Sequence, residues 1–313
     1  MTLNFAIVIA TRNRPENIEK LLSSIVLNSS QPDLVSIVSS GESVNNLIDK
    51  YSKKINIIHK HTILSGQVYQ RKIGIEALQN KVDLVALLDD YVILDQNFVR
   101  ECVSSFTQVS DKIVGMGMTV TNIKEKSVRL KILRRFLKNY STKRGSVLVS
   151  GSTTPYQDLP KFSPTEWLNG TSVWRSHIFT EFSHPDISGS YSAYEDLIFS
   201  YGVGKKYELC TNSDLKISYS DRVLFPRNYF NRTFVSNLNK LYFIEKNKEL
   251  SRFWFYINYF FTLSTGILRV FISPSKITMY ILLGHSMSAK YLLKYEFLRY
   301  RKKVGEDWLL RQI

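Results

Sequence analysis

Short apolar runs alternate with helical patterns along the N-terminal part of the chain, and this alternation constrains the fold more than any other feature. The apolar runs cover residues 5–10, 34–38, 55–58 and 82–88, and the segments 15–27, 42–51 and 66–78 between them are patterned as helices. In the first helix Pro15 takes a first-turn position, and one face carries Ile18, Leu21, Leu22 and Ile25. The alternation predicts an α/β fold with a mostly parallel sheet covered by helices on both faces.

Polar residues follow the apolar runs, where the carboxyl ends of parallel strands would form a ligand site. Arg12 and Arg14 follow the first run and could contact a nucleotide, or Thr11 and Asn13 simply organise the turn into the helix. Arg71 lies in the first turns of its helix, where a cation opposes the helix dipole. A bound anion, or an acid of the fold, would account for it.

Two pairs of acids stand at the ends of predicted elements. Asp89 and Asp90 directly follow the run 82–88, where they can hold a divalent cation that bridges a pyrophosphate, or merely cap the strand. Glu195 and Asp196 begin an apolar helix, which is ordinary capping chemistry or the position of a catalytic base for a sugar hydroxyl.

An aromatic and glycine segment precedes a helix predicted to start at Arg175. Trp167 can stack on a sugar ring, and Gly170 lets the backbone approach a ligand, with Asn169 between them. The same tryptophan also suits a hydrophobic core.

The chain is strongly basic, with 42 Lys and Arg against 27 Asp and Glu and a net charge of +15. Such a balance indicates a polyanionic partner, or a generally basic surface. Residues 124–144 hold nine bases and one acid. This stretch is either a helix that binds lipid or pyrophosphate or a solvated face of the surface. No recognition helix, zinc-ligand spacing or aromatic RNA-binding signature accompanies the charge, so nucleic acid is not the expected partner. The two distant cysteines indicate a reducing compartment.

The C-terminal third is apolar and then basic. Residues 253–272 contain one charge, Arg269, and residues 290–303 contain six bases and one acid. The first segment is long enough to span a membrane, but polar residues interrupt it. An interfacial anchor on anionic lipid, a true span and a buried core helix are the alternatives, and we favour the anchor. Since no secretory signal is visible, we expect a cytoplasmic protein bound peripherally to the inner face of the cell membrane.

Taken in order, the motifs between residues 5 and 247 resemble the inverting family 2 glycosyltransferases of the GT-A fold, of the kind that assemble bacterial surface polysaccharides. Residues 7–15 resemble the first strand and nucleotide loop, and residues 66–75 resemble the donor-side helix, with Lys72 where Asn is usual. Further resemblances are residues 87–91 to the Asp-x-Asp metal motif, 167–175 to the acceptor segment, 194–197 to the motif of the catalytic base, and 239–243 to a helix before a membrane-associated tail.

The resemblance implies a GT-A-like domain over residues 1–225, with a basic insertion at about 123–145, and a helical, membrane-associating region over 226–313. Asp196 would deprotonate the acceptor, supported by Glu195. A nucleoside-diphosphate sugar would be the donor, a lipid-pyrophosphate-linked glycan the acceptor, and Mg²⁺ or Mn²⁺ the cofactor at Asp89 and Asp90. The implied donor-binding residues are Thr11, Arg12, Arg14, Ser39, Arg71, Asp89 and Asp90, and the acceptor-binding residues are Trp167, Asn169 and Gly170.

The chain departs from the family pattern at three places. Tyr91 stands at the third position of the metal motif, so Asp90 is expected to carry the metal contact with Asp89, or binding is weaker. Ser39 stands where many relatives have an acid, which leaves the nucleobase open, and residues 218–219 replace a common histidine. These departures favour the alternative of a degenerate, non-catalytic scaffold, whereas the retained Asp90 and Asp196 favour an enzyme.

Overall fold

The computed structural model describes residues 3–78, 81–122, 141–185, 193–220, 226–301, 304–305 and 307–312. The chain packs as two compact units. The first, here called the sheet unit, comprises residues 1–126, 155–186 and 196–222, and the second, the helical unit, comprises residues 127–154, 187–195 and 223–313. The predicted boundary at residue 225 stays a prediction. Most of the basic insertion, residues 123–140, lies outside the described residues.

The sheet unit contains one mixed sheet in the order β3-β2-β1-β4-β8-β6-β9-β5, with β7 paired to β9. Strands β3, β2, β1 and β4 are parallel to their neighbours in this order, as the sequence predicts. Strand β8 is antiparallel to both β4 and β6, and β9 is parallel to β6. The strands are β1 (Phe5–Arg12), β2 (Leu34–Ser40), β3 (Ile57–Thr62), β4 (Leu84–Asp89), β5 (Val92–Leu94), β6 (Ile113–Val120), β7 (Ser163–Pro164), β8 (Ser172–Arg175) and β9 (Glu208–Tyr219).

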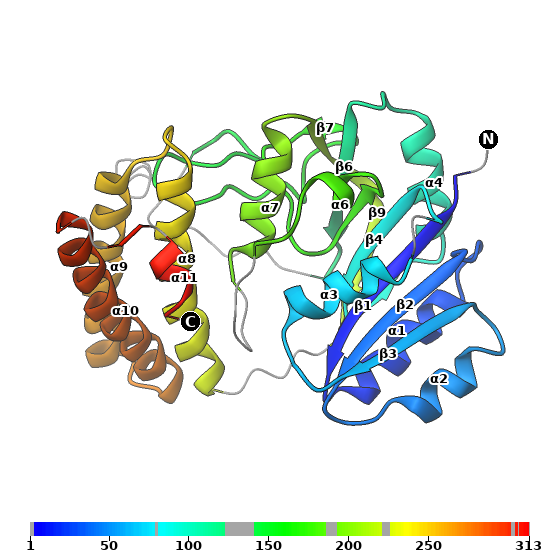
Figure 1. Ribbon diagram of the computed structural model, residues 1–313, viewed down its shortest axis with the longest axis horizontal. Coiled ribbons are helices and arrows are strands. Elements are labelled where there is room, and N and C mark those ends of the chain that lie inside the picture. The colour runs from blue at the N-terminus through cyan, green and yellow to red at the C-terminus, as the bar shows by residue number, and fades with distance from the viewer. Residues whose placement is uncertain are drawn as a thin grey trace. The chain divides into compact units, whose positions relative to one another are not determined.

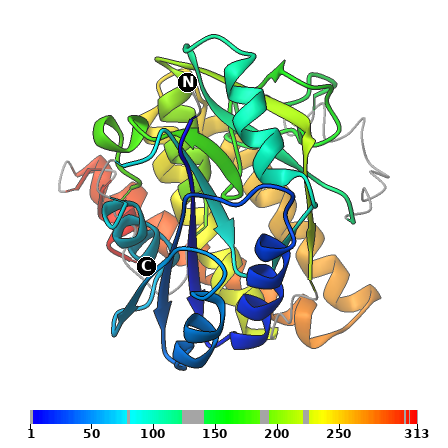
Figure 2. The same ribbon diagram turned by 90° about the vertical axis from the view of Figure 1, so that its right-hand side faces the viewer.

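Helices cover both faces of this sheet (Figures 1 and 2). Alternate residues of β1 point to opposite faces, so Phe5 and Ile7 join one core cluster and Ala6 and Val8 the other. The first cluster receives α1 (Pro15–Val26), α2 (Asn45–Tyr51) and α4 (Phe98–Thr107), and the second receives α6 (Ile178–Glu181) and α7 (Glu195–Gly204), with Leu78, just beyond α3 (Gln67–Glu76). The fold is therefore the α/β architecture that the alternation predicts.

Two local predictions differ from the structure. The helix predicted from Arg175 is wrong, because residues Ser172–Arg175 form strand β8 and the next helix begins at Ile178. Strand β8 is stabilised by pairing on both sides, a long-range effect that its four residues do not reveal. The third strand lies at Ile57–Thr62, two residues later than the apolar run.

The described part of the helical unit has three long helices and a short one: α8 (Pro226–Lys246), α9 (Arg252–Ile272), α10 (Lys276–Tyr300) and α11 (Asp307–Leu310). Ser275 and Thr278 form a capping box that starts α10. Arg252 on α9 pairs with Glu245 on α8 and with Glu296 on α10, and the Tyr256 hydroxyl donates to Glu296 at 2.6 Å. These charged contacts fix the three helices against one another.

Candidate active site

Helix α3 is held against the carboxyl ends of β1 and β2. The side-chain amide of Gln70 donates to the carbonyl oxygens of Thr11, at 2.9 Å, and Val38, at 2.8 Å. One turn later, a Cβ atom at Gly74 would lie 2.6 Å from Val8 Cγ1, so glycine permits the close approach. Because Gln70 and Gly74 hold the helix in this position, Arg71, the residue after Gln70, lies at the carboxyl ends of these strands.

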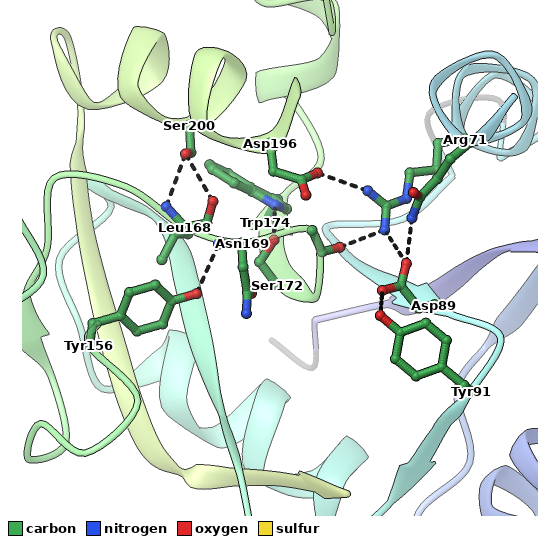
Figure 3. Close-up of polar contacts among 12 residues, drawn as sticks. Arg71, Asp89, Tyr91, Tyr156, Leu168, Asn169, Ser172, Trp174, Asp196 and Ser200 are labelled. Atoms are coloured by element: carbon green, nitrogen blue, oxygen red, sulfur yellow. Dashed lines mark hydrogen bonds and ion pairs between the residues drawn. The ribbon is translucent and has the colours of Figure 1, made fainter. Parts of the chain in front are cut away.

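The guanidinium of Arg71 joins three separate segments of the sheet unit (Figure 3). Nη1 donates to Asp196 Oδ1 at 3.0 Å, and Nη2 donates to Asp89 Oδ1 at 3.0 Å and to the Gly170 carbonyl at 2.8 Å. Arg71 is 1% exposed, so these contacts form in surroundings that strengthen electrostatic interactions. The structure therefore brings together four of the sequence-predicted site residues, with Arg71 at their centre.

Asp196 has the environment of a base. Burial raises the pKa of the Asp196 carboxyl group, and the neighbouring Arg71 guanidinium opposes that rise. A carboxylate with a raised pKa accepts a proton more readily than an ordinary aspartate. Its predicted partner Glu195, the first residue of α7, is also buried.

Asp89 and Asp90 are adjacent in sequence but have different partners. The Tyr91 hydroxyl donates to Asp89 Oδ2 at 2.6 Å, and Oδ1 accepts from Arg71 and from the Gln67 amide. Asp90 is 3% exposed, and burial raises the pKa of its carboxyl group despite the opposing charge of Arg14. Its Oδ2 accepts from Thr11 Oγ1 at 3.0 Å, and its Oδ1 pairs with Arg14 Nη1 at 2.9 Å. All four carboxylate oxygens therefore already have protein donors.

This donor set does not fit the divalent ion that the resemblance implies. A hard cation needs carboxylate oxygens that are available to it, and those of Asp89 and Asp90 are engaged as described. Within the described ranges, no group of three His, Cys, Asp or Glu residues could hold a metal. The metal role of the two aspartates stays a prediction from the motif.

The remaining predicted donor residues lie at the ends of β1 and β2. Arg12 is exposed at the end of β1. Ser39 is buried, and its hydroxyl lies 2.8 Å from His59 Nε2 and 3.1 Å from His61 Nδ1. Both histidines lie in β3 and are not among the site residues predicted from the sequence. Their alternation nevertheless places them on one face of the strand. Burial is the main cause that lowers the pKa of His59, and the neighbouring His61 lowers it further.

Hydrogen bonds from its backbone hold the predicted acceptor segment in place. The Leu168 amide donates to Ser200 Oγ at 2.9 Å, and the Asn169 amide donates to the Tyr156 hydroxyl at 2.9 Å (Figure 3). Trp167 is half-buried and packs edge-to-face on Tyr156, with ring centroids 5.1 Å apart. The segment thus presents the Gly170 carbonyl to Arg71.

His184 is a second feature that the sequence did not reveal. Its ring stacks on Phe199, with centroids 4.1 Å apart. Burial, with the nearby positive charge of Arg71, lowers the pKa of His184 to about 3, so the imidazole is neutral. A lone histidine between Ser183 and Pro185 gives no signal by spacing.

Residues 6–157 match the model of the family described as Glycosyl transferase family 2. Among solved structures, S. aureus TarS 1–349 is similar with a TM-score of 0.52 and 12% identity, over 85% of this chain and 74% of that chain. The same fragment in complex with UDP-GlcNAc is similar with a TM-score of 0.50 and 13% identity, over 78% and 71%. The mannosyltransferase PcManGT from Pyrobaculum calidifontis, in complex with GDP-Man and Mn²⁺, has a TM-score of 0.55 and 9% identity, over 92% and 88%.

A search of curated proteins gave no match. At such identities the structural neighbours establish the fold, and the match over residues 6–157 adds the class of enzyme. The chain is a glycosyltransferase with a GT-A-like α/β fold.

Proposed function

We propose that the sheet unit transfers a sugar from a nucleoside-diphosphate sugar to an acceptor hydroxyl, with inversion at the anomeric carbon. The observation that carries this proposal is the contact of Arg71 with Asp196 and Asp89, each at 3.0 Å. The binding of UDP-GlcNAc by one structural neighbour and of GDP-Man by another supports a nucleotide-sugar donor.

In the proposed reaction Asp196 takes the proton of the acceptor hydroxyl as its oxygen attacks the anomeric carbon. The new carbon–oxygen bond forms as the bond to the diphosphate breaks, and the leaving diphosphate keeps the electron pair. Arg71 lies where a cation would stabilise that charge. The divalent ion implied by the resemblance is assigned no step.

The other predicted residues take supporting roles in this proposal. Thr11 and Arg14, both bonded to Asp90, frame the nucleotide together with Arg12 and Ser39. Glu195 supports Asp196 at the start of α7. The acceptor contacts Trp167, Asn169 and Gly170.

The substitution Asp196→Asn tests this assignment, because an amide keeps the shape of the side chain but cannot take the proton. We expect transfer to fall by about a hundred-fold or more while binding of UDP or GDP sugars is retained. Asp214→Asn is the matched control, since Asp214, in β9, is partly exposed and forms an ion pair with Lys161, away from Arg71 and Asp89 in sequence. Near-normal turnover in Asp196→Asn would reject Asp196 as the base, whereas a folded wild-type chain without any turnover would favour the non-catalytic scaffold, which Tyr91 also supports.

We also propose that the helical unit holds the protein peripherally on an anionic membrane, at its cytoplasmic face. Helix α9 carries an exposed apolar stripe along its length, since Phe253, Phe260, Ile267 and Phe271 recur on one side. Phe271 is 80% exposed. On α10 the exposed residues Met279, Leu283, Met287, Leu293 and Phe297 are interleaved with Lys290, Lys294 and Arg301.

Charge and burial favour the interfacial anchor over its alternatives. Residues 252–301 contain seven bases and one acid, Glu296, which is engaged with Arg252. Such a surface is typical of helices that lie on anionic lipid. Helix α9 is long and apolar enough to cross a membrane. Of its most apolar stretch 22% is buried, which disfavours the interpretation as a buried core helix. Its exposed side carries the polar residues Thr262 and Ser264, which a spanning helix would place in lipid.

A membrane-bound enzyme of this kind suits a lipid-pyrophosphate-linked glycan as acceptor, within cell-surface polysaccharide synthesis. The acceptor carries its own negative charge at the lipid surface, where the bases of α10 would lie. This part of the proposal follows from the surface chemistry and from the family resemblance.

Sedimentation of the full chain with vesicles tests the anchor. We expect binding to phosphatidylglycerol vesicles, weak binding to phosphatidylcholine vesicles, and weakening by salt. Lys290→Gln with Lys294→Gln should weaken binding by about thirty-fold, because each base contributes about 1 kcal/mol near an anionic surface. Lys53→Gln with Lys54→Gln, in the exposed turn after α2, is the matched control. Retention in membranes after alkaline carbonate would instead indicate a span, and the absence of any lipid binding would contradict the anchor.

A further inference from the structure

Tyr91 occupies the third position of the motif that begins at Asp89, and the structure fixes it firmly. It lies between β4 and β5 and is 8% exposed. Its carbonyl accepts from the Ser220 amide at 2.8 Å and from Ser220 Oγ at 3.1 Å. Its ring packs edge-to-face against Tyr219, with centroids 4.9 Å apart. The phenol is therefore held in one place by contacts at both its backbone and its ring.

The fixed phenol changes the chemistry of Asp89. An aspartate at position 91 would add a carboxylate beside Asp89, whereas Tyr91 adds a neutral donor, whose hydroxyl lies 2.6 Å from Asp89 Oδ2. The other oxygen, Oδ1, already accepts from Arg71 and Gln67. Both oxygens of Asp89 thus accept from protein donors, and one of these donors is Arg71.

The cations beside the two acidic residues belong to the protein itself. Arg71 is a permanent positive charge between Asp89 and Asp196. Arg14 supplies a second guanidinium at the end of β1. Charge stabilisation of a leaving diphosphate needs preorganised positive groups. The Arg14 side chain is 39% exposed and is open to a ligand, whereas Arg71 is 1% exposed with both Nη groups engaged and would act through its charge alone.

We propose that this chain transfers its sugar without a divalent ion, with Tyr91 holding Asp89 against Arg71 and the arginines stabilising the leaving diphosphate. The inference rests on the proposed function and departs from the metal that the resemblance implies. The carbon–oxygen bond to the diphosphate breaks with its electron pair on the phosphate oxygen, and the acceptor proton passes to Asp196. No further reactant is required.

Metal binding can be measured separately from transfer. The full-length chain and the variants Tyr91→Asp and Tyr91→Phe are titrated with Mn²⁺ in the presence of UDP or GDP, and free Mn²⁺ is followed by electron paramagnetic resonance. We expect the wild-type protein to bind no Mn²⁺ beyond what the nucleotide alone binds. Tyr91→Asp restores the third acid, so Mn²⁺ affinity should rise by about tenfold or more. Tyr91→Phe should gain no affinity, because it adds no carboxylate.

Activity supplies the second readout. Transfer, or donor hydrolysis where no acceptor is known, should persist in EDTA within about two-fold, because arginine rather than metal carries the charge. Tight Mn²⁺ binding by the wild-type protein, or loss of activity in EDTA with recovery in Mn²⁺, would overturn the inference. A folded chain that turns over no sugar nucleotide under any condition would instead reject the proposed function, and the Mn²⁺ titration would still decide the metal question. If Tyr91→Asp does not fold, the Mn²⁺ titrations of the wild-type protein and of Tyr91→Phe still test whether the site binds a metal.

Discussion

The substitution Gly170→Ala should separate the two charges at the centre of the site. A Cβ atom at residue 170 would lie 2.5 Å from Asp196 Oδ2 and 2.9 Å from Arg71 Nη1, whereas ordinary contacts begin near 3.4 Å. The added methyl group must therefore displace the Asp196 carboxylate by about 0.9 Å, the difference of these two values. A misplacement of about 1 Å at a catalytic group lowers rates by about a hundred-fold. We expect kcat/KM to fall by about that factor, which corresponds to about 2.7 kcal/mol of transition-state stabilisation.

The assay compares kcat/KM for sugar transfer in the wild-type chain, Gly170→Ala and Gly202→Ala, with urea unfolding of each. Gly202 lies in α7, the helix that also carries Asp196, and a Cβ atom there meets nothing within 4 Å. Gly202→Ala should therefore retain full activity and gain up to about 1 kcal/mol of stability from helix propensity. If Gly170→Ala keeps kcat/KM within about three-fold of the wild type, the displacement argument is refuted.

Two further predictions concern pH and packing. Since burial raises the pKa of Asp196 and the base must be ionised to act, kcat/KM should fall as the pH drops through that raised pKa, at a higher pH than for an ordinary aspartate; a profile that stays flat down to the usual aspartate range would contradict this. Gly115→Ala should lower the free energy of unfolding by about 1–3 kcal/mol, because its Cβ atom would lie 2.6 Å from Trp174 Cζ3 in a packed core. Urea midpoints measure the second effect, and an unchanged midpoint would show that the core yields at little cost.

The parallel half of the sheet was predictable because its signals are local. Each of β1, β2 and β4 is a continuous apolar run, and such runs read as strands buried on both faces. Strand β3 is less buried and carries His59, Lys60 and His61. The predicted strand therefore ends at residue 58, where the apolar run ends, although β3 continues to Thr62. The antiparallel half depends on pairings between distant segments, as β8 shows, and no local pattern encodes those partners.

The site was predictable in its residues more than in its contacts. The order of the motifs placed Arg71, Asp89, Gly170 and Asp196 in one site, and their hydrogen bonds join them there. The partners of Asp90 were not foreseen, because adjacent residues at the end of a strand point in opposite directions. That alternation sends Asp89 toward Arg71 and Asp90 toward Thr11 and Arg14.

The energetics of the buried charges bear on whether the chain is an enzyme or only a scaffold. Arg71 is almost fully buried and pairs with two carboxylates that are partly exposed, and the desolvation of such groups can exceed their mutual attraction. Well-packed apolar residues of similar volume at these three positions would often leave the fold as stable or more stable. The charged arrangement is therefore a poor device for stability alone. It is, however, what the proposed glycosyl transfer would use, namely a fixed cation beside a carboxylate whose pKa is raised. A chain that served only as a scaffold would have no physical need for Arg71, Asp89 and Asp196 together, and this contrast favours catalysis at this site.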